Sequence, residues 1–517
     1  MTRIRSTWKC LGGVTQLPLV LVLLVVNVAA RELQQPGLFS ENIERNTLQL
    51  EFGKRSAPRG TERHQMKPMA DTFSTIREDL ATGAGALHAH IMHRDAPSSP
   101  FRLSNRTRVE RMHVTISRDN LRVASIHGRI NQTVNGLTRS RSRDRQTKVP
   151  SQDFQAPVVS GLSLGSGEYF IRISVGTPPR RMYLVMDTGS DILWLQCAPC
   201  VNCYHQSDAI FDPYKSSTYS TLGCSTRQCL NLDIGTCQAN KCLYQVDYGD
   251  GSFTTGEFGT DDVSLNSTSG VGQVVLNKIP LGCGHDNEGY FVGAAGLLGL
   301  GKGPLSFPNQ VDPQNGGRFS YCLTDRETDS TEGSSLVFGE AAVPPAGARF
   351  TPQDSNMRVP TFYYLKMTGI SVGGTILTIP TSAFQLDSLG NGGVIIDSGT
   401  SVTRLQNAAY ASLRDAFRAG TSDLAPTAGF SLFDTCYDLS GLASVDVPTV
   451  TLHFQGGTDL KLPASNYLIP VDNSNTFCLA FAGTTGPSII GNIQQQGFRV
   501  IYDNLHNQVG FVPSQCN

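Results

Sequence analysis

This chain of 517 residues has almost no net charge of either sign. Its 42 lysines and arginines are matched by 43 aspartates and glutamates, which leaves a formal net charge of −1. This balance excludes a wholly basic nucleic-acid-binding protein and a disordered polyelectrolyte. Charged residues make up only 16% of the chain, whereas 39% are hydrophobic and 52 are glycines. That composition is typical of a globular, turn-rich protein with much β-structure.

A long hydrophobic run is missing beyond the first thirty residues. Residues 1–30 have a basic start, an apolar stretch from Leu17 to Val26 and the small-residue ending Val28-Ala29-Ala30. This is the layout of a secretory signal peptide that is cleaved after Ala30. The apolar stretch is shorter than the ~20 residues that cross a bilayer, so no membrane span is expected after the signal is removed.

The signal peptide predicts entry into the secretory pathway and an extracellular protein, with the endoplasmic reticulum and the vacuole as alternatives. A plastid transit peptide is a weaker alternative, because such peptides are Ser-rich and amphipathic and contain no Leu/Val block.

Cysteine is absent between residues 31 and 150, and the charge divides at the same place. Residues 31–150 carry 21 basic and 12 acidic side chains, for a net charge of +9, whereas residues 151–517 carry −13. The total length also exceeds what one hydrophobic core supports, so at least two domains are expected. We interpret residues 31–155 as a basic pro-segment that inhibits the acidic body intramolecularly. A solvated linker is the alternative, because charge runs are usually solvated.

The arginine run from Arg139 to Arg145 raises the separate possibility of nucleic-acid binding. Aromatic residues for base stacking are absent around it. No nucleic-acid partner is therefore expected, and a nucleic-acid-associated protease remains an alternative only.

Twelve of the thirteen cysteines lie in the body, and their even number in an oxidising compartment predicts six disulfides. A zinc or iron–sulfur site at Cys197-x-x-Cys200-x-x-Cys203 is the alternative, but no paired His motif accompanies it, so no metal is expected. Nine cysteines precede position 345 and three follow it, and two odd numbers require a bridge between the halves. The candidate is Cys322–Cys516. The twelve cysteines are Cys197, Cys200, Cys203, Cys224, Cys229, Cys237, Cys242, Cys283, Cys322, Cys436, Cys478 and Cys516.

The body contains one sequence pattern twice. Alternating apolar residues predict strands that run into Asp187-Thr188-Gly189-Ser190 and, 210 residues later, into Asp397-Ser398-Gly399-Thr400. Each copy has a downstream apolar-apolar-Gly element, Leu297-Leu298-Gly299 and Ile489-Ile490-Gly491. A two-copy repeat of this period indicates two similar lobes rather than a solenoid. Each Asp ends a buried strand, where a scaffold can hold a side chain rigidly at a cleft.

With this duplicated motif, residues 165–517 resemble the pepsin-like aspartic peptidases. The Cys-rich segment 197–242 and the run Ile91-Met-His-Arg-Asp-Ala-Pro-Ser-Ser-Pro are similar to the plant nepenthesin-type group. The runs that begin at Leu281, Asp434 and Gly491 are most similar to the plant guard-cell aspartic protease type. The resemblance implies a mainly β, bilobal fold with a cleft between the lobes. The expected parts are the signal peptide 1–30, the pro-segment 31–155, the N-terminal lobe 156–345 and the C-terminal lobe 346–517.

The resemblance also implies the chemistry. Asp187 and Asp397 form the catalytic dyad of an endopeptidase that is made as a zymogen, acts on polypeptides at acidic pH and needs no cofactor. The residues expected to support the dyad are Thr188, Gly189, Ser190, Ser398, Gly399 and Thr400. Thr188 and Ser398 are expected to bond across to the opposite loop, while Ser190 and Thr400 donate to the outer carboxylate oxygens.

Tyr248 and Gly249 begin a predicted hairpin tip, because the following Asp-Gly suits a two-residue turn. In the family this hairpin is the flap over the substrate, and Trp194 matches the partner of the flap tyrosine. A purely structural role for either aromatic is the alternative.

A catalytically silent binding or inhibitor protein on the same fold is the main rival function, although such relatives normally carry a broken tetrapeptide. We further expect a monomer with a glycan on Asn266, within Asn266-Ser-Thr.

Overall fold

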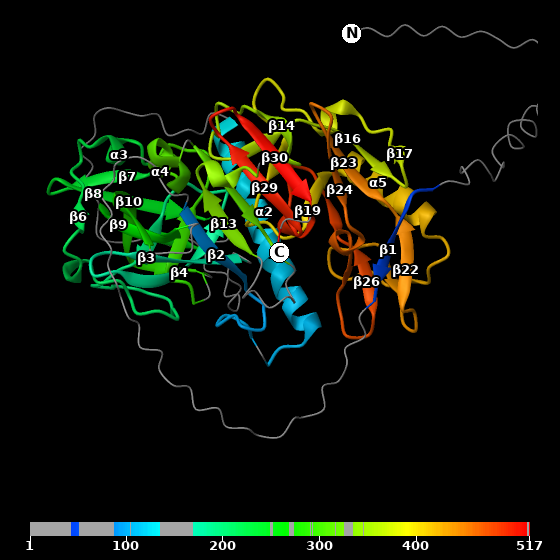
Figure 1. Cartoon of the computed structure of the whole chain (residues 1–517), viewed down its shortest axis with the longest axis horizontal. Coiled ribbons are helices and arrows are strands. Elements are labelled where there is room, and N and C mark those ends of the chain that lie inside the picture. Colours follow the sequence, from blue (N-terminus) through cyan, green and yellow to red (C-terminus); the bar gives the residue numbers. More distant parts are fainter. Residues whose placement is uncertain are drawn as a thin grey trace, which may run out of the picture. The chain divides into compact units, whose positions relative to one another are not determined.

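The computed structural model describes residues 43–50, 87–103, 105–134, 169–248, 252–267, 273–289, 291, 293–315, 317–324, 334–344, 346–513 and 516. The predicted signal peptide and the arginine run 139–145 lie outside this described part. From Glu44 onward the chain forms one compact unit. It consists mainly of β-strands gathered in two lobes, which confirms the predicted fold class (Figure 1).

The first lobe is built around the long hairpin β9–β10, which pairs with the strands on both sides of it. Its central strands are largely buried, and β3 leaves only Arg172 exposed. Its elements are β3 (Tyr169–Val175), β4 (Arg180–Asp187), β5 (Trp194–Gln196), β6 (Ser220–Thr221), β7 (Gly235–Gln238), β8 (Lys241–Asp247), β9 (Phe253–Ser267), β10 (Gln273–Glu288), β11 (Gly296–Gly299), β12 (Arg318–Cys322) and β13 (Ser335–Phe338), with the helices α3 (Arg227–Leu230) and α4 (Phe307–Asn315) and the 3₁₀ turns η1 (Pro213–Lys215) and η2 (Glu340–Ala342).

The second lobe adds two four-stranded sheets, β17-β16-β23-β24 and β20-β21-β26-β25, to a set of strands that contains β18 and β28. Its elements are β14 (Arg349–Asp354), β15 (Tyr363–Leu365), β16 (Met367–Val372), β17 (Thr375–Ile376), β18 (Val394–Ile396), β19 (Thr403–Gln406), β20 (Pro426–Thr427), β21 (Cys436–Asp438), β22 (Ser444–Pro448), β23 (Val450–Phe454), β24 (Thr458–Leu462), β25 (Leu468–Pro470), β26 (Thr476–Leu479), β27 (Phe481–Thr484) and β28 (Ser488–Ile490), with α5 (Asn407–Gly420), α6 (Asn492–Gln495), η3 (Thr381–Ala383) and η4 (Ala464–Asn466).

The C-terminal hairpin joins the lobes. β29 (Phe498–Asp503) pairs with β12 of the first lobe, and β30 (Gln508–Pro513) pairs with β14 at the start of the second. One buried apolar cluster accordingly contains side chains of both lobes, among them Ile171 and Ile396. Because this core is shared, it fixes the position of one lobe against the other.

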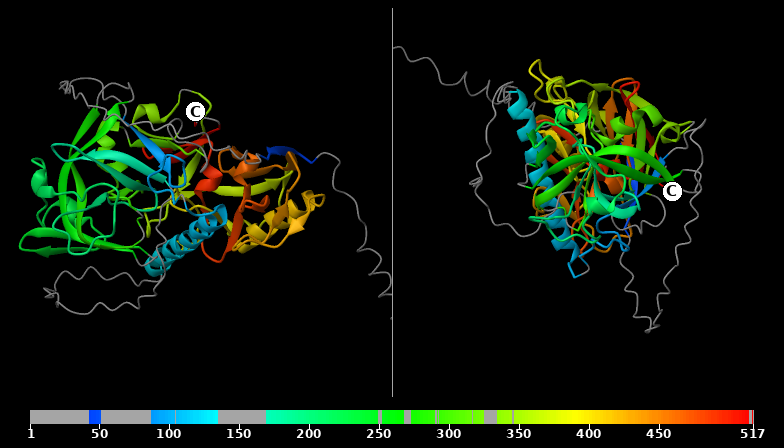
Figure 2. Two further views of the ribbon diagram at one scale, coloured as in Figure 1. Left: turned by 90° about the horizontal axis from the view of Figure 1, so that it is seen from below. Right: turned by 90° about the vertical axis from the view of Figure 1, so that its left-hand side faces the viewer.

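Three elements of the described structure come from the expected pro-segment. β1 (Arg45–Gln49) pairs antiparallel with β22 of the second lobe, and β2 (Leu87–His93) pairs with β3, β9 and β13 of the first. The helix α2 (Arg108–Val134) lies across the boundary between the lobes (Figures 1 and 2). The described part of residues 31–155 is therefore built into the body.

The sequence of α2 explains why it is a helix. Thr107 and Glu110 form a capping box: the Thr107 amide donates to Glu110 Oε2 at 2.7 Å, and the Glu110 amide donates to Thr107 Oγ1 at 3.2 Å. Buried apolar residues then recur at spacings of three, four and seven, on one face of the helix. They are Met112, Ile116, Val123, Ile126 and Ile130, and they pack on side chains of the second lobe.

Six disulfides join all twelve cysteines of the body. The three cysteines of the possible metal motif are among them, since Cys197 is bonded to Cys283 and Cys200 to Cys203. The candidate bridge between the halves, Cys322–Cys516, is present and closes the longest loop, with a sequence separation of 194.

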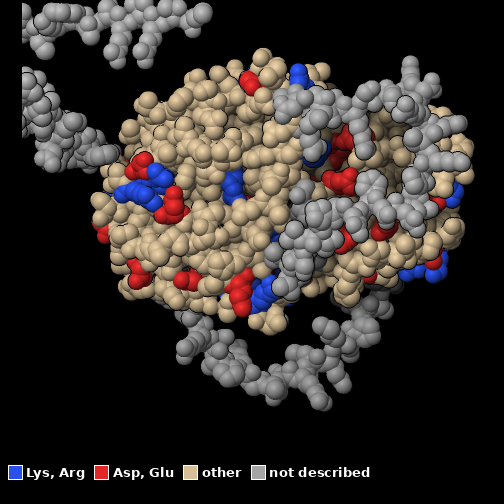
Figure 3. Space-filling model, turned by 180° about the vertical axis from the view of Figure 1, so that it is seen from behind, with Lys and Arg blue, Asp and Glu red and all other residues tan. Residues whose placement is uncertain are grey.

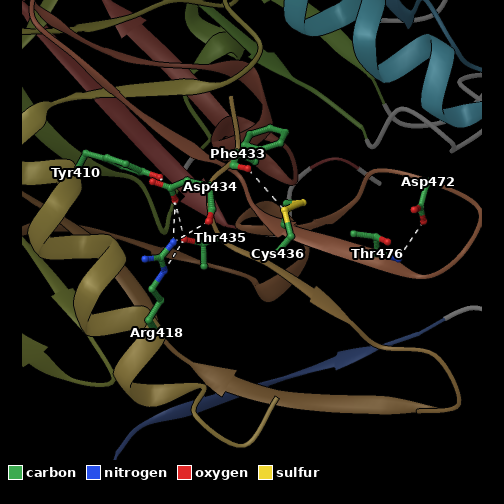
Figure 4. Close-up of a disulfide and its surroundings, with 9 residues drawn as sticks. Tyr410, Arg418, Phe433, Asp434, Thr435, Cys436, Asp472 and Thr476 are labelled. Atoms are coloured by element: carbon green, nitrogen blue, oxygen red, sulfur yellow. Dashed lines mark hydrogen bonds and ion pairs between the residues drawn. A yellow bond between two sulfur atoms is a disulfide. The ribbon is translucent and has the colours of Figure 1, made fainter. Parts of the chain in front are cut away.

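The run that begins at Asp434 contains Cys436, which is bonded to Cys478 in one disulfide of the second lobe (Figure 4). Asp434 accepts a hydrogen bond from Tyr410 Oη at 2.6 Å, and Arg418 Nη2 donates to the Asp434 carbonyl at 2.7 Å. Tyr410 and Arg418 lie on α5, so this helix fixes the start of β21 and with it Cys436. α5 is amphipathic, and its buried face includes Tyr410, Leu413 and Phe417.

Candidate active site

Asp187 and Asp397 occupy equivalent positions in the two lobes. Asp187 is the last residue of β4, which runs parallel to β11, and its register partner is Gly299. Asp397 directly follows β18, which runs parallel to β28. Both carboxylates are almost completely buried. The duplicated sequence pattern thus corresponds to a duplicated structure, in which a strand leads into an aspartate and a loop follows it.

The glycines of the two downstream elements leave room for the chain that follows each aspartate. A Cβ atom on Gly299 would lie 2.4 Å from the carbonyl carbon of Asp191, and one on Gly491 would lie 2.5 Å from the carbonyl oxygen of Ser401. Both distances are far below van der Waals contact. A larger residue at either position would therefore displace the aspartate loop, which explains why both copies of the pattern end in glycine.

Thr188 and Ser398 link the two aspartate loops. The Ser398 amide donates to Thr188 Oγ1 at 2.9 Å, and the Thr188 amide donates to Ser398 Oγ at 3.2 Å. Each residue therefore accepts through its hydroxyl and donates through its backbone, which gives the pair an approximate two-fold symmetry. The hydrogen bonds hold the two lobes in register at the point where the carboxylates face each other.

Each carboxylate also receives hydrogen bonds from its own loop. Ser190 Oγ donates to Asp187 Oδ2 at 2.5 Å, and Thr400 Oγ1 donates to Asp397 Oδ2 at 2.6 Å. The amide of Gly189 donates to Asp187 Oδ1 at 2.9 Å, and the amide of Gly399 to Asp397 Oδ1 at 3.3 Å. Such donors favour the ionised form of a carboxyl group. The structure therefore brings together all eight residues of the two tetrapeptides.

Arg122 of α2 bridges the two carboxylates. Its Nε donates to Asp397 Oδ2 at 2.7 Å and its Nη2 to Asp397 Oδ1 at 2.8 Å, while Nη2 also donates to Asp187 Oδ1. The guanidinium lies so close to both loops that a Cβ atom on Gly189 or Gly399 would approach it to within 2.4 or 2.5 Å. Only 11% of its side chain is exposed. The space between the carboxylates is thus occupied by the chain itself.

Burial and charge act in opposite directions on Asp397 and Arg122. Burial alone would raise the pKa of Asp397, but the charge of Arg122 and the hydrogen bonds from Arg122 and Thr400 together lower it below its ordinary value. Burial likewise opposes the charge of Arg122, yet the two aspartates raise the pKa of its guanidinium well above the usual value. Arg122 and Asp397 therefore stabilise each other's charged form, and the same guanidinium is hydrogen-bonded to Asp187.

A second arginine of α2 fixes the Asp187 loop. Arg129 Nη1 donates to the Gly189 carbonyl at 3.0 Å, and its guanidinium lies over the Phe362 ring, 5.1 Å from the centroid. Asp191, on the other side of the loop, accepts from Thr361 Oγ1 at 2.8 Å, and burial raises the pKa of Asp191. The loop is therefore held both by the second lobe and by the pro-segment helix.

Trp194 and Tyr248 meet at the base of the predicted flap. Trp194 Nε1 donates to Tyr248 Oη at 2.9 Å, and both rings pack edge-on against Phe291. β8 and β9 pair antiparallel up to Asp247 and Phe253, so they form the two arms of a hairpin. Gly249, which the sequence predicts at the tip, lies outside the described residues. Asn266, the candidate glycan site, is exposed near the end of β9.

Sequence reasoning missed α2 and the residues by which it reaches the aspartates. The capping box at Thr107 and the apolar spacing from Met112 to Ile130 would have indicated a helix. Nothing in the sequence, however, distinguishes Arg122 from the many other arginines of the front section. Within the described residues there is no group of three or more His, Cys, Asp or Glu side chains arranged to hold a metal ion. Nor does any helix there have the length and apolarity needed to cross a membrane.

Comparison with known proteins identifies the family. Two family models match, described as "Xylanase inhibitor N-terminal" over residues 169–340 and "Xylanase inhibitor C-terminal" over residues 362–513. "Aspartyl protease family protein 2" of Arabidopsis thaliana is 52% identical over 87% of this chain and 90% of its own. "Protein ASPARTIC PROTEASE IN GUARD CELL 2" of the same plant is 46% identical over 82% and 87%, and nepenthesin-1 of Nepenthes gracilis is 42% identical over 69% and 80%.

Solved structures agree on the fold. The crystal structure of edgp superposes with a TM-score of 0.56 at 22% identity, covering 69% of this chain and 96% of that one. Basic 7S globulin from soybean gives a TM-score of 0.53 at 21% identity, covering 67% and 93%. The sequence relatives confirm the predicted resemblance to both the guard-cell and the nepenthesin types. The chain therefore belongs to the pepsin-like aspartic proteases of plants and is an aspartic endopeptidase of that family.

Proposed function

We propose that this endopeptidase hydrolyses peptide bonds with Asp187 and Asp397 and is made as a zymogen that α2 keeps inactive. The observation that carries the proposal is the position of Arg122, which bonds to both carboxylates at once. A side chain that donates hydrogen bonds to both carboxylates excludes water and substrate from the space between them. The same chain thus supplies a complete pair of aspartate loops and the group that blocks them.

The chemistry follows from two carboxylates that share one site. Once Arg122 has left, like charges so close together cannot both ionise easily, so the pair holds one proton, as is general for the aspartic-protease dyad. The ionised member takes a proton from water as the water attacks the scissile carbonyl carbon. The protonated member transfers its proton to the carbonyl oxygen, which gives a tetrahedral diol intermediate. The first member then passes the proton that it took from water to the leaving nitrogen, the second takes a proton back from a diol hydroxyl, and the C–N bond breaks.

The flap completes this site. Tyr248 is held by Trp194, which is itself fully buried, so its ring has a fixed anchor at the base of the hairpin. We assign Tyr248 and Gly249 to substrate covering and Trp194 to positioning Tyr248.

Acid is the expected trigger for release of α2. Docking lowers the pKa of Asp397, whereas the undocked dyad holds one proton, so the attraction is fully present above the pKa of the undocked dyad and is progressively lost as the pH falls towards the lowered value. Protonation of Asp397 removes a partner of Arg122 and leaves the buried guanidinium less well paired. The enzyme is therefore expected to activate and to work at acidic pH.

A catalytically silent binding protein on this fold is the rival, since both matching family models are named after a xylanase inhibitor. Both tetrapeptides are intact, however, and each aspartate has its full set of hydroxyl and amide donors. A nucleic-acid-associated role would call for a continuous basic patch. On the face shown in Figure 3, the Lys and Arg residues of the described part are instead scattered among acidic and uncharged residues.

The six disulfides support passage through the secretory pathway, because such bonds persist in oxidising compartments. We propose an extracellular monomer that carries a glycan on the exposed Asn266.

The test is to incubate the purified precursor with a denatured protein from pH 3 to pH 7, with and without a statine-type transition-state analogue. Inhibitor-sensitive hydrolysis that appears only at acidic pH is expected. Asp187→Asn and Asp397→Asn should each lower the rate by about 10²- to 10⁴-fold, the usual contribution of a general acid or base. Full hydrolysis by the double variant Asp187→Asn/Asp397→Asn would refute the mechanism. Binding of the denatured protein without hydrolysis at any pH would favour the catalytically silent rival.

A further inference from the structure

A second side chain of α2 occupies an anion site that follows the Asp397 loop. The Asp119 carboxylate forms an ion pair with Arg404 Nη2 at 2.7 Å and accepts hydrogen bonds from the amides of Ser401 and Val402. The pair is buried, with 0% of the Asp119 side chain and 5% of the Arg404 side chain exposed. One guanidinium and two backbone N–H groups that converge on a carboxylate form a strong, charge-assisted recognition site.

Arg404 depends on the pro-segment for its charge pairing. In the described part of the chain, its other hydrogen bonds go from Nη2 to Asn120 Oδ1 at 2.8 Å and from Nη1 to the Val402 carbonyl at 3.0 Å. Asp119 and Asn120 both belong to α2. When α2 leaves, Arg404 keeps a backbone carbonyl of its own segment but loses the carboxylate, and a desolvated cation without a partner charge is costly.

The anion site lies within reach of a substrate at the dyad. Asp119 and Arg122 are three residues apart on α2, so they share a face, with Cβ atoms about 5–6 Å from each other. Arg122 marks the position of the scissile bond, and Asp119 marks the anion site. An extended peptide rises about 3.3 Å per residue. A side chain a few residues from the scissile bond can therefore occupy the place of Asp119.

We propose that Arg404, with the amides of Ser401 and Val402, forms a subsite of the mature enzyme that binds an acidic side chain of the substrate. The inference rests on the proposed function, because it requires α2 to leave the cleft. It adds the substrate class: polypeptides with Asp or Glu a few residues from the cleaved bond. The pro-segment then blocks the enzyme twice, by Arg122 at the dyad and by Asp119 at this subsite.

The experiment compares matched quenched-fluorescence peptides that carry Glu or Gln at one position, scanned over the four residues on either side of the scissile bond. The enzyme is released from the full precursor by acid and assayed from pH 3 to pH 5.5. At one position, kcat/KM at pH 5.5 should be about tenfold or more higher for Glu than for Gln, since a hydrogen bond to a charged group contributes this much. The ratio should fall towards one at pH 3, where the free carboxyl is protonated.

Variants assign this preference to Arg404. Because Arg404→Gln alone leaves Asp119 buried without its cation, the precursor is made as the double variant Asp119→Asn/Arg404→Gln, which keeps the contact neutral on both sides. It should lose the Glu preference, whereas Arg404→Lys should retain part of it. Arg418→Gln is the matched control, because it removes an arginine that bonds Asp434 on the α5 side of the lobe. It should leave the ratio unchanged.

The outcomes separate the subsite from the mechanism. A Glu-to-Gln ratio near one at every position at pH 5.5, or a ratio that survives in the double variant, overturns the subsite while the protease stands. Hydrolysis of neither peptide at any pH overturns the proposed function and the subsite with it. Inhibition constants of matched statine peptides with Glu or Gln give a second readout, which needs only binding.

Discussion

At the scale of single residues, Arg122 is expected to set the activation threshold. Replacing it by Gln leaves two buried carboxylates without their cation, and breaking a buried ion pair costs about 3–5 kcal/mol. Docking of α2 should therefore weaken by 10²-fold or more. The Arg122→Gln precursor should hydrolyse a denatured protein at a higher pH than the unaltered precursor does, which a pH series of initial rates measures.

The control for Arg122 is another arginine of the same helix. Arg111 Nη1 bonds the Arg106 carbonyl within the pro-segment, away from the aspartates. Arg111→Gln removes the same charge and should leave the pH threshold in place. An equal shift in both variants would mean that overall charge, and not contact with the dyad, holds the helix.

His127 is a second residue whose protonation opposes docking. Its Nε2 lies 3.2 Å from the Pro487 carbonyl, and burial, helped by the charge of Arg404, lowers the pKa of His127 below 6.5 despite that contact. The released helix therefore binds a proton more readily, and docking weakens as the pH falls below about 6.5. His127→Gln, which keeps a donor for Pro487, should move the activation midpoint to a lower pH. An unchanged midpoint would assign the acid response to the carboxylates alone.

At the scale of elements, the cap of α2 should control how firmly the helix docks. Thr107→Ala removes the side-chain half of the capping box, and the loss of such a cap costs about 1 kcal/mol. The expected result is faster amide hydrogen exchange in the first turns of α2 and activation at a slightly higher pH.

Two controls separate the cap from the glycan motif Asn105-Arg-Thr107, which the same substitution destroys. Thr107→Ser keeps both the cap and the motif, and Asn105→Gln keeps the cap alone. Both should behave like the unaltered precursor, and an effect of Asn105→Gln equal to that of Thr107→Ala would refute the capping explanation.

At the scale of the whole molecule, the pro-segment is held at three separate places. β1 is paired with β22 in the second lobe, β2 lies inside the sheet of the first, and α2 lies between them. A single cut at an engineered protease site between α2 and β3 should therefore leave the pro-segment bound and the enzyme inactive at pH 7. Size-exclusion chromatography followed by denaturing electrophoresis detects the bound fragment. Its separation at pH 7 would show that covalent linkage is what retains it.

The disulfides also act at the scale of the molecule. Cys322–Cys516 spans 194 residues, whereas Cys224–Cys237 spans 13. Chain-entropy arguments make the longer loop more stabilising by about 2 kcal/mol. Replacing the long-range pair by serines should lower the thermal unfolding temperature more than replacing the short-range pair. Equal losses would indicate that local packing outweighs loop length.

The sequence by itself determined the fold class and the position of the aspartates, because both depend on local patterns. Strand periodicity, the two tetrapeptides and the Gly299 and Gly491 elements are contiguous features, and each constrains its own backbone directly. The even number of cysteines likewise followed from counting.

Only the tertiary structure decided which residues of the front section reach the cleft. Net charge suggested a diffuse attraction between residues 31–150, with +9, and residues 151–517, with −13. The contact is instead made by particular side chains, Arg122 at the dyad and Asp119 at Arg404. Which of many arginines meets a carboxylate depends on the rotation and depth of α2 against both lobes. Packing of Met112 to Ile130 sets that geometry, and a linear pattern does not encode it. The balanced charge of the chain thus conceals a few buried, specific ion pairs.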